Sequence, residues 1–208
     1  MRVTVEQRET NRARLLEAAA TEFARAGLDA ANINEISLAA GFAKGTVYNH
    51  FPSKEALFLA VVEEACARAA GGAERPRSGA PTAERLRAIL GSKVEWVREH
   101  EDFARVLVRE VLTADPRFYP NILAAAAPFI ESVLAILRDG VDRGEVRADL
   151  PVDQLALIFT GLGELALLQH WGSGGAWPTL EAIPDLVTGA FLEGAAPRAS
   201  APKARSRR

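Results

Sequence analysis

Cysteine is almost absent from the sequence: Cys66 is the single example in 208 residues. One thiol cannot close an intramolecular disulfide, so the sequence excludes the small secreted domains that several bridges hold together, and it indicates a reducing compartment. Cys66 lies in an apolar, helically periodic stretch, where we interpret it as a packed thiol. Apolar residues make up 49% of the chain and charged residues 25%, which is ordinary globular usage and excludes a disordered chain.

The sequence also lacks a hydrophobic run that could cross a membrane, which takes about 18 consecutive apolar residues. The longest apolar stretch, 155–168, has 14 residues and includes the polar Thr160 and Glu164. The charged first residues are not followed by an apolar segment, so they do not resemble a secretory signal. We therefore expect a cytoplasmic protein without a membrane partner.

A charge excess of either sign is missing too, since the formal net charge is -2. This average conceals a division along the chain. Residues 1–60 are neutral, residues 61–196 carry the acidic excess, and residues 197–208 hold five basic side chains and no acidic one. Nucleic-acid binding would therefore depend on a local field at one end of the chain.

The alternation of β-branched residues that is typical of strands is nearly absent, whereas apolar residues recur at three- and four-residue spacings. The sequence therefore predicts an all-α fold. Helices are expected over 9–26, 33–40, 44–51 and 54–70. Two further helices are expected to end at about 99 and at about 113, and the last three to cover 120–143, 152–170 and 180–194. Pro128 should kink its helix because it removes a backbone donor.

Local signals place the ends of the first four helices. Gly27 and Gly41 are expected to stop the first and second, Asn32 to cap the start of the second, and Pro52 to end the third. Ser53 then caps the fourth. The stretch 71–81 is rich in Gly and Pro and predicts a loop or hinge.

These signals divide the chain into two domains and a tail. We place an N-terminal three-helix domain at 1–60, with a linking helix to about 71, and a helical C-terminal domain at 72–196. The basic tail at 197–208 has too few large apolar residues to join a core and is expected to be disordered.

The predicted helix at 152–170 is apolar on nearly every side. A helix on the surface of a monomer would show a polar face, so this one must be covered twice, by its own domain and by a second subunit. Paired with the last helix, 180–194, across a two-fold axis, it would form the four-helix bundle of a homodimer. A central position in a monomeric bundle is the alternative.

Two short helices joined by Gly41, Phe42 and Ala43, behind a longer first helix, predict a helix-turn-helix. The second short helix would enter the major groove of DNA. Val47 and Phe51 are spaced for the core. The remaining side chains are left for solvent or DNA, namely Lys44, Gly45, Thr46, Tyr48, Asn49 and His50.

These side chains have the chemistry of DNA contacts. Lys44 can donate to guanine O6 and N7, Asn49 can pair with adenine, and Thr46 can touch a thymine methyl or a phosphate. Tyr48 and His50 can donate to phosphate oxygens. Lys54 is a cation in the first turn of a helix, where the helix dipole disfavours it unless an anion binds there, so it is either a phosphate ligand or an ordinary exposed lysine.

Many residues between about 10 and 60 follow one fixed spacing: Leu15–Leu16–Glu17–Ala18–Ala19, Phe23, Gly27, Ile36, Ala40–Gly41, Lys44–Gly45–Thr46–Val47–Tyr48, His50–Phe51 and Ser53–Lys54–Glu55–Ala56–Leu57. In this spacing the chain resembles the tetracycline-repressor (TetR/AcrR) family. The resemblance implies a dimeric transcription regulator, usually a repressor, with an N-terminal DNA-binding domain and a C-terminal domain that senses a ligand and dimerises.

Carried over by position, the family's groove contacts fall on Lys44, Gly45, Thr46 and Asn49, and its phosphate contacts on Thr46, Tyr48, His50 and Lys54. The sequence departs from the family at two positions. Ala43 stands where a serine or threonine often caps the recognition helix, and Ser37 replaces a frequent alanine. Ala43 cannot cap, which should soften the recognition helix until DNA orders it.

The resemblance also implies a mostly apolar effector pocket in the C-terminal domain. Candidate lining residues are Trp96, His100, Phe103, Phe118, Phe129, Phe159, Glu164 and His170. The alternative, which is the commoner role, is ordinary core for the aromatic residues and a satisfied or surface histidine for His100 and His170. Glu164 is expected among leucines, where it must be paired or protonated and could meet a cationic ligand or the other subunit. No cofactor and no metal are expected.

An enzyme and a non-sensing architectural DNA-binding protein are the competing classes. The glycines of 161–166 match G-x-G-x-x-A without the strand-helix units that a dinucleotide site needs, and the histidines lack metal-ligand spacing. We therefore expect no enzyme. The architectural protein stays open until a sequence-specific, ligand-sensitive site is found.

Overall fold

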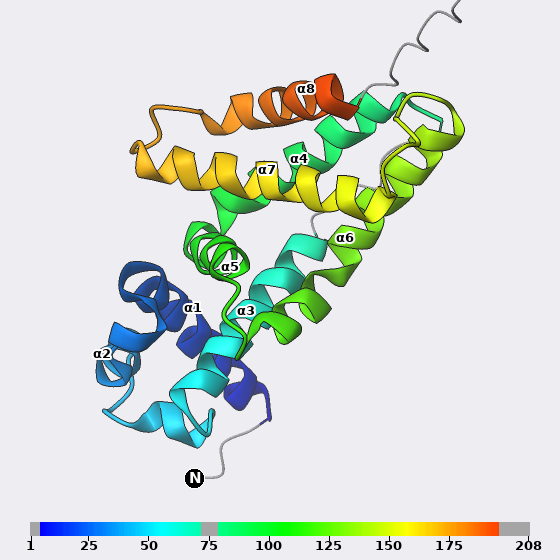
Figure 1. Ribbon diagram of the computed structural model, residues 1–208. Helices are drawn as coiled ribbons and strands as arrows, with labels where there is room; N and C mark the ends of the chain where they lie inside the picture. Colours follow the sequence, from blue (N-terminus) through cyan, green and yellow to red (C-terminus); the bar gives the residue numbers. More distant parts are fainter. Residues whose placement is uncertain (1–4, 72–78, 196–208) are drawn as a thin grey trace, which may run out of the picture. The chain divides into compact units, whose positions relative to one another are not determined.

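The structure is a computed structural model that describes residues 5–71 and 79–195 (Figure 1). The expected basic tail at 197–208 lies outside these residues. The described residues contain helices and no strand, so the all-α prediction is confirmed. The elements are α1 (Val5–Ala30), α2 (Ile33–Ala39), η1 (Thr46–Asn49), α3 (Lys54–Gly71), α4 (Thr82–Glu99), α5 (Glu101–Thr113), α6 (Tyr119–Asp142), α7 (Val152–Gly172), η2 (Leu180–Ala182) and α8 (Ile183–Ala195).

The chain forms two compact units, each described here by itself. The first contains residues 1–73 and 92–129, and the second residues 74–91 and 130–208. The helices α4 and α6 each contribute residues to both. The predicted domain limits at 60, 71 and 196 stay a prediction, because compactness alone does not define the DNA-binding and sensing domains.

In the first unit α1, α3 and α5 pack against one another. The apolar stripe of α1 is buried as its spacing predicts, with Leu15, Ala19 and Phe23 fully inaccessible. The ring of Phe23 meets that of Phe58 from α3 edge-on, with 5.2 Å between centroids. Gly27 ends the first stretch of helix in α1 as predicted, since its φ of +75° and ψ of 172° are not helical, and a further turn follows in which Ala31 N donates to Gly27 O.

The segment 44–51 differs from its prediction as a short α-helix. The structure has a turn at 44–45 and then a 3-10 helix, Thr46–Asn49. Gly45 takes the left-handed conformation, φ +80°, which an α-helix does not accommodate, and no side chain caps the segment. Ala43 could not supply such a cap, so the missing cap and the glycine together explain the difference.

In the second unit α7 packs on α8, as Figure 1 shows. Phe159 and Phe191 form an edge-on ring pair with 5.2 Å between centroids. The start of α4 is held by the turn after α6, because Glu145 Oε2 accepts from Thr82 N at 2.6 Å. Arg85 of α4 forms an ion pair with Asp139 of α6. The hydrogen bond and the ion pair therefore fix the start of α4 to α6 and to the turn that follows it.

The helix α7 keeps a large apolar surface. Leu157 is 68% exposed and Leu168 46% exposed, although Phe159 on the same helix is fully buried. Ile158, Leu165, Trp177 and Leu186 are also exposed. We call this set the α7–α8 apolar face. Three of its members, Leu165, Trp177 and Leu186, line one groove, and exposed apolar patches mark interaction sites in soluble proteins.

By length and composition alone, α6 and α7 are each apolar enough to cross a membrane. Neither helix has about 18 consecutive apolar residues, because charged residues interrupt them, Glu131 in α6 and Glu164 in α7. A helix that packs inside a protein or against a second subunit has the same composition. The two helices are therefore weak evidence for a membrane.

Candidate nucleic-acid interface and effector residues

The turn between α2 and η1 has the geometry of a helix-turn-helix. Asn32 caps α2, since its Oδ1 accepts from Asn34 N at 2.9 Å. Gly41 turns the chain at φ +77°, and Phe42 N donates to Ser37 O at 2.8 Å. Ser37 itself is buried, and its hydroxyl has no hydrogen-bond partner within the described part of the chain. The backbone hydrogen bond from Phe42 N to Ser37 O therefore closes the turn.

The side chains after this turn separate into core and surface as expected. Val47 is fully buried and Phe51 is 4% exposed, so they anchor the segment. Tyr48 is 55% exposed. Lys44 and Asn49 are exposed as well, while Gly45, Thr46 and His50 are half-buried. The six candidates for groove and phosphate contacts thus lie on one seven-residue stretch, and their contact with DNA stays a prediction.

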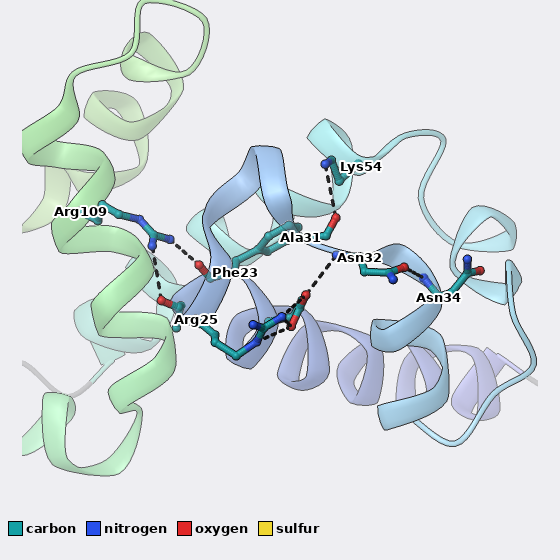
Figure 2. A network of polar contacts seen from close by, with 9 residues as sticks. Phe23, Arg25, Ala31, Asn32, Asn34, Lys54 and Arg109 are labelled. Carbon is teal, nitrogen blue, oxygen red and sulfur yellow. Dashed lines mark hydrogen bonds and ion pairs between the residues drawn. The ribbon is translucent and has the colours of Figure 1, made fainter.

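Lys54 binds the end of α1 in this structure. Its Nζ donates to the carbonyl oxygens of Asp29 at 2.9 Å and Ala31 at 3.4 Å (Figure 2). The predicted cap of α3 is confirmed, because Ser53 Oγ accepts from Ala56 N at 3.1 Å. Hydrogen bonds from its own amide and from the Ser53 hydroxyl lower the pKa of Glu55. Lys54 therefore ties α3 to the α1–α2 joint, the residues between the break in α1 and the start of α2. A phosphate bound by Lys54 would have to share its ammonium group with these two carbonyls.

Figure 2 shows how the break in α1 is satisfied by side chains from other turns and helices. Arg109 of α5 donates to the carbonyl oxygens of Phe23 at 2.5 Å and Ala24 at 3.4 Å. The Glu22 carboxylate accepts from Asn32 N at 3.1 Å and pairs with Arg25. Carbonyls at a helix end need such donors, because the next turn of helix does not supply them. The α1–α2 joint is thus fixed to α3 and α5.

Five effector candidates belong to the first unit, and one arginine contacts two of them. The guanidinium carbon of Arg68 lies 4.2 Å from the ring centroid of Phe103, and its Nη1 lies 3.4 Å from His100 Nδ1. Arg68 also pairs with Glu17 and Glu64 at 2.8 and 2.9 Å. His100 and Phe103 are therefore held in a polar cluster at the junction of α1, α3 and α5.

The other candidates in this unit lie in different surroundings. Trp96 is buried, and its indole N–H has no hydrogen-bond partner within the described residues. Phe118 packs on Phe58 with 5.3 Å between ring centroids. Phe129 is half-buried, with Lys93 Nζ 5.2 Å from its ring centroid. Of these three, Trp96 therefore offers a buried, unused donor.

Three effector candidates belong to the second unit. Phe159 packs on Phe191, as described above. Glu164 is 7% exposed, so its expected burial is confirmed. His170 Nδ1 lies 2.8 Å from the carbonyl oxygen of Pro178 and helps to order the α7–α8 connection. The structure therefore gives His170 a local structural contact, and the effector roles of all eight residues stay predictions.

Sequence analysis did not identify Arg68 and Arg109. Arg109 meets Phe23 across 86 positions of the chain, and a contact of that range leaves no spacing signal in a single sequence. Burial raises the pKa of Glu110, which neighbours Arg109, and the ion pair between them lowers it in part. An Arg-Glu pair inside an amphipathic helix was the only available hint.

Comparison with known proteins covers both halves of the chain. Residues 15–61 match the family model described as bacterial regulatory proteins, tetR family, and residues 79–177 match the tetracyclin repressor-like, C-terminal domain. The repressor AcnR of Corynebacterium glutamicum is 28% identical over 192 residues, covering 91% of this chain and 97% of AcnR. The repressor KstR2 of Rhodococcus jostii is 29% identical over 189 residues, covering 89% of this chain and 91% of KstR2.

The fold has solved counterparts as well. The regulator FadR of Bacillus subtilis, in complex with stearoyl-CoA, superposes with a TM-score of 0.76 at 19% identity, covering 88% of this chain and 98% of FadR. At this identity the likeness concerns the fold. The helix-turn-helix geometry and the first family match, residues 15–61, therefore agree on the same stretch of chain.

Proposed function

Because this chain belongs to the TetR family of DNA-binding transcription regulators and is not an enzyme, we propose that it is a repressor that binds a palindromic operator as a homodimer and is released by a small, largely apolar effector. The observation that carries the proposal is the closed helix-turn-helix together with the exposed side chains of Lys44, Tyr48 and Asn49 that follow its turn. A soluble DNA-binding regulator of this kind acts in the cytoplasm.

Residues 44–50 supply the proposed contacts with DNA. Lys44 and Asn49 are exposed at the two ends of the stretch and have the donors that read guanine and adenine. Tyr48, Thr46 and His50 donate to phosphates and set the register on the duplex. Gly45 lets the backbone approach the groove, and Lys54 adds a cation where α3 begins.

The α7–α8 apolar face supports a homodimer. Its exposed leucines and Trp177 would be covered by the same face of a second copy, as a two-fold axis requires. The stretches 44–50 of the two copies, the recognition segments, would then read two half-sites one turn of the DNA helix apart if they are separated by about 34–36 Å. A palindromic operator follows from that symmetry.

An apolar effector is supported by the aromatic candidates, most of which are buried. The FadR neighbour binds stearoyl-CoA, a ligand with a long apolar chain. An effector that prefers the conformation in which the recognition segments miss the half-site spacing would weaken DNA binding, by a coupling of typically about 1–3 kcal/mol. Buried Glu164 is the candidate for a polar contact with the effector or with the other subunit.

Selection of bound duplexes from random DNA by the purified protein tests the proposal. We expect a palindrome, its loss with Tyr48→Ala, and partial retention with Tyr48→Phe, which keeps the ring and removes the phenolic donor. Salt-sensitive binding without a preferred sequence would instead identify an architectural protein. For the effector, Glu164→Gln that leaves folding, dimerisation and ligand response unchanged would exclude a role for Glu164.

A further inference from the structure

Two arginines of α1 lie at the two ends of the recognition segment. The recognition segment is the stretch 44–50. The guanidinium carbon of Arg14 is 5.0 Å from the ring centroid of Phe42, two residues before this segment. The guanidinium carbon of Arg12 is 5.4 Å from the ring centroid of Phe51, the residue directly after it. Both arginine side chains are exposed. A cation therefore stands at each end of the segment that is proposed to enter the groove.

These guanidinium groups differ from the other arginines in their charge environment. Within residues 5–71 and 79–195, neither Arg12 nor Arg14 has a carboxylate at ion-pair distance, and the same holds for Arg8 on the same helix. The remaining described arginines all pair with a carboxylate: Arg25, Arg68, Arg85, Arg87, Arg98, Arg105, Arg109, Arg117, Arg138, Arg143 and Arg147. The uncompensated positive charge of the described arginines is thus concentrated in the first turns of α1.

The stacked geometry suits a phosphate ligand. A guanidinium that lies over an aromatic ring keeps its N–H groups at its edge, where they can point at an anion. Stacking also restricts a long side chain before binding, so less side-chain freedom is lost when the contact forms. Planar guanidinium groups form paired hydrogen bonds with phosphate oxygens, and no protein carboxylate competes for these two.

We propose that Arg12 and Arg14 bind backbone phosphates of the duplex on either side of the recognition segment, so that the DNA-binding surface extends from η1 onto α1. This inference rests on the DNA binding proposed above. Because phosphates are the same in every sequence, the two arginines increase affinity for any duplex and set the position of the protein on it, without selecting bases.

Four variants and two duplexes test the proposal. Arg12→Gln and Arg14→Gln remove the charge and keep a polar side chain, and Arg12→Lys and Arg14→Lys restore the charge. Arg138→Gln, at an exposed arginine of α6 paired with Glu131, is the matched control. Binding is measured by fluorescence anisotropy at several salt concentrations, on the selected palindrome and on a scrambled duplex, after circular dichroism has shown unchanged helical content.

We expect each Gln variant to weaken binding several-fold, by the same factor on both duplexes, and to reduce the slope of log K against log salt by about one unit for each phosphate contact removed. The Lys variants should recover the salt slope, and the control should equal the wild type. Unchanged affinity and slope in the Gln variants would overturn the proposal. A loss that Lys does not rescue would also overturn it, because packing on the rings would then be the cause. Failure of the wild-type protein to bind either duplex would contradict the proposed function instead.

Discussion

Arg109 of α5 donates to the carbonyl oxygen of Phe23 on α1, with 2.5 Å between Nη2 and O. The carbonyl is available because Gly27 breaks α1 one turn later, at φ +75° and ψ 172°. A side chain from the region that follows the linking helix α3 therefore completes the end of the first helix of the DNA-binding motif. The two positions are 86 residues apart, so this contact couples the folding of α5 to that of α1.

Arg109→Ala is expected to destabilise the protein by about 1–3 kcal/mol, because two main-chain carbonyls lose a charged donor. The loss should lie toward the lower figure, because the Arg109 side chain is partly exposed. Chemical denaturation followed by circular dichroism measures this loss. Arg105→Ala, one turn earlier on α5, removes an exposed pair with Glu101 and should cost about 0.5 kcal/mol or less. Equal effects of the two variants would contradict the role of Arg109.

Lys54→Gln is expected to lower stability in the absence of DNA by about 1 kcal/mol, because the carbonyls of Asp29 and Ala31 lose their donor. A thermal melt of the free protein is the measurement. An ordinary surface lysine would show no change in such a melt, and that result would remove the structural role assigned to Lys54. Loss of DNA affinity beyond the change in stability would then report its phosphate contact.

Stability is expected to depend on pH through Glu145. The hydrogen bond from the Thr82 amide, aided by the nearby Arg143 charge, lowers the pKa of Glu145 in the folded protein. A carboxylate with a lowered folded pKa contributes stability above its unfolded pKa, about 4.3, and that contribution is lost as the pH falls through the lowered value. Glu145→Gln should therefore be less stable than the wild type at pH 7, and the difference should shrink below about pH 4. A difference in unfolding free energy that stays constant over this range would contradict the assignment.

Leu168→Glu is expected to convert the proposed homodimer to a monomer, because it places a charge in the α7–α8 apolar face. Leu112→Glu on α5 is the matched control, since Leu168 and Leu112 are 46% and 44% exposed. Light scattering coupled to size-exclusion chromatography gives the mass of each variant. A wild type that is monomeric, or a Leu168→Glu variant that stays dimeric, would show that this face is not the interface.

The helices could be predicted from the sequence because their signals are local. The buried stripe of α1, the Asn32 cap and the Ser53 cap all follow from residues within four positions of one another. The prediction of an α-helix over 44–51 is wrong in detail. The apolar spacing indicates an α-helix, but Gly45 takes a left-handed conformation that spacing does not reveal.

The candidate site divides in the same way. The stretch 44–50 could be predicted from its chemistry, whereas Arg12 and Arg14 lie in an N-terminal region of zero net charge that gives no sign of them. Their distinction is the absence of ion-pair partners in the described residues, together with the two aromatic rings, and both are properties of the folded chain. The roles of Arg68 and Arg109 likewise depend on contacts between distant helices.

The central claim is that residues 44–50 read base sequence on a palindromic operator. The most direct measurement compares the affinities of the wild type, Asn49→Ala and Lys44→Ala for the selected palindrome and for a scrambled duplex of equal length and composition. The account predicts that the wild type prefers the palindrome by about a thousandfold or more, and that each variant loses most of this preference while keeping its affinity for the scrambled duplex. Equal binding of both duplexes by the wild type, or an undiminished preference in both variants, would contradict it.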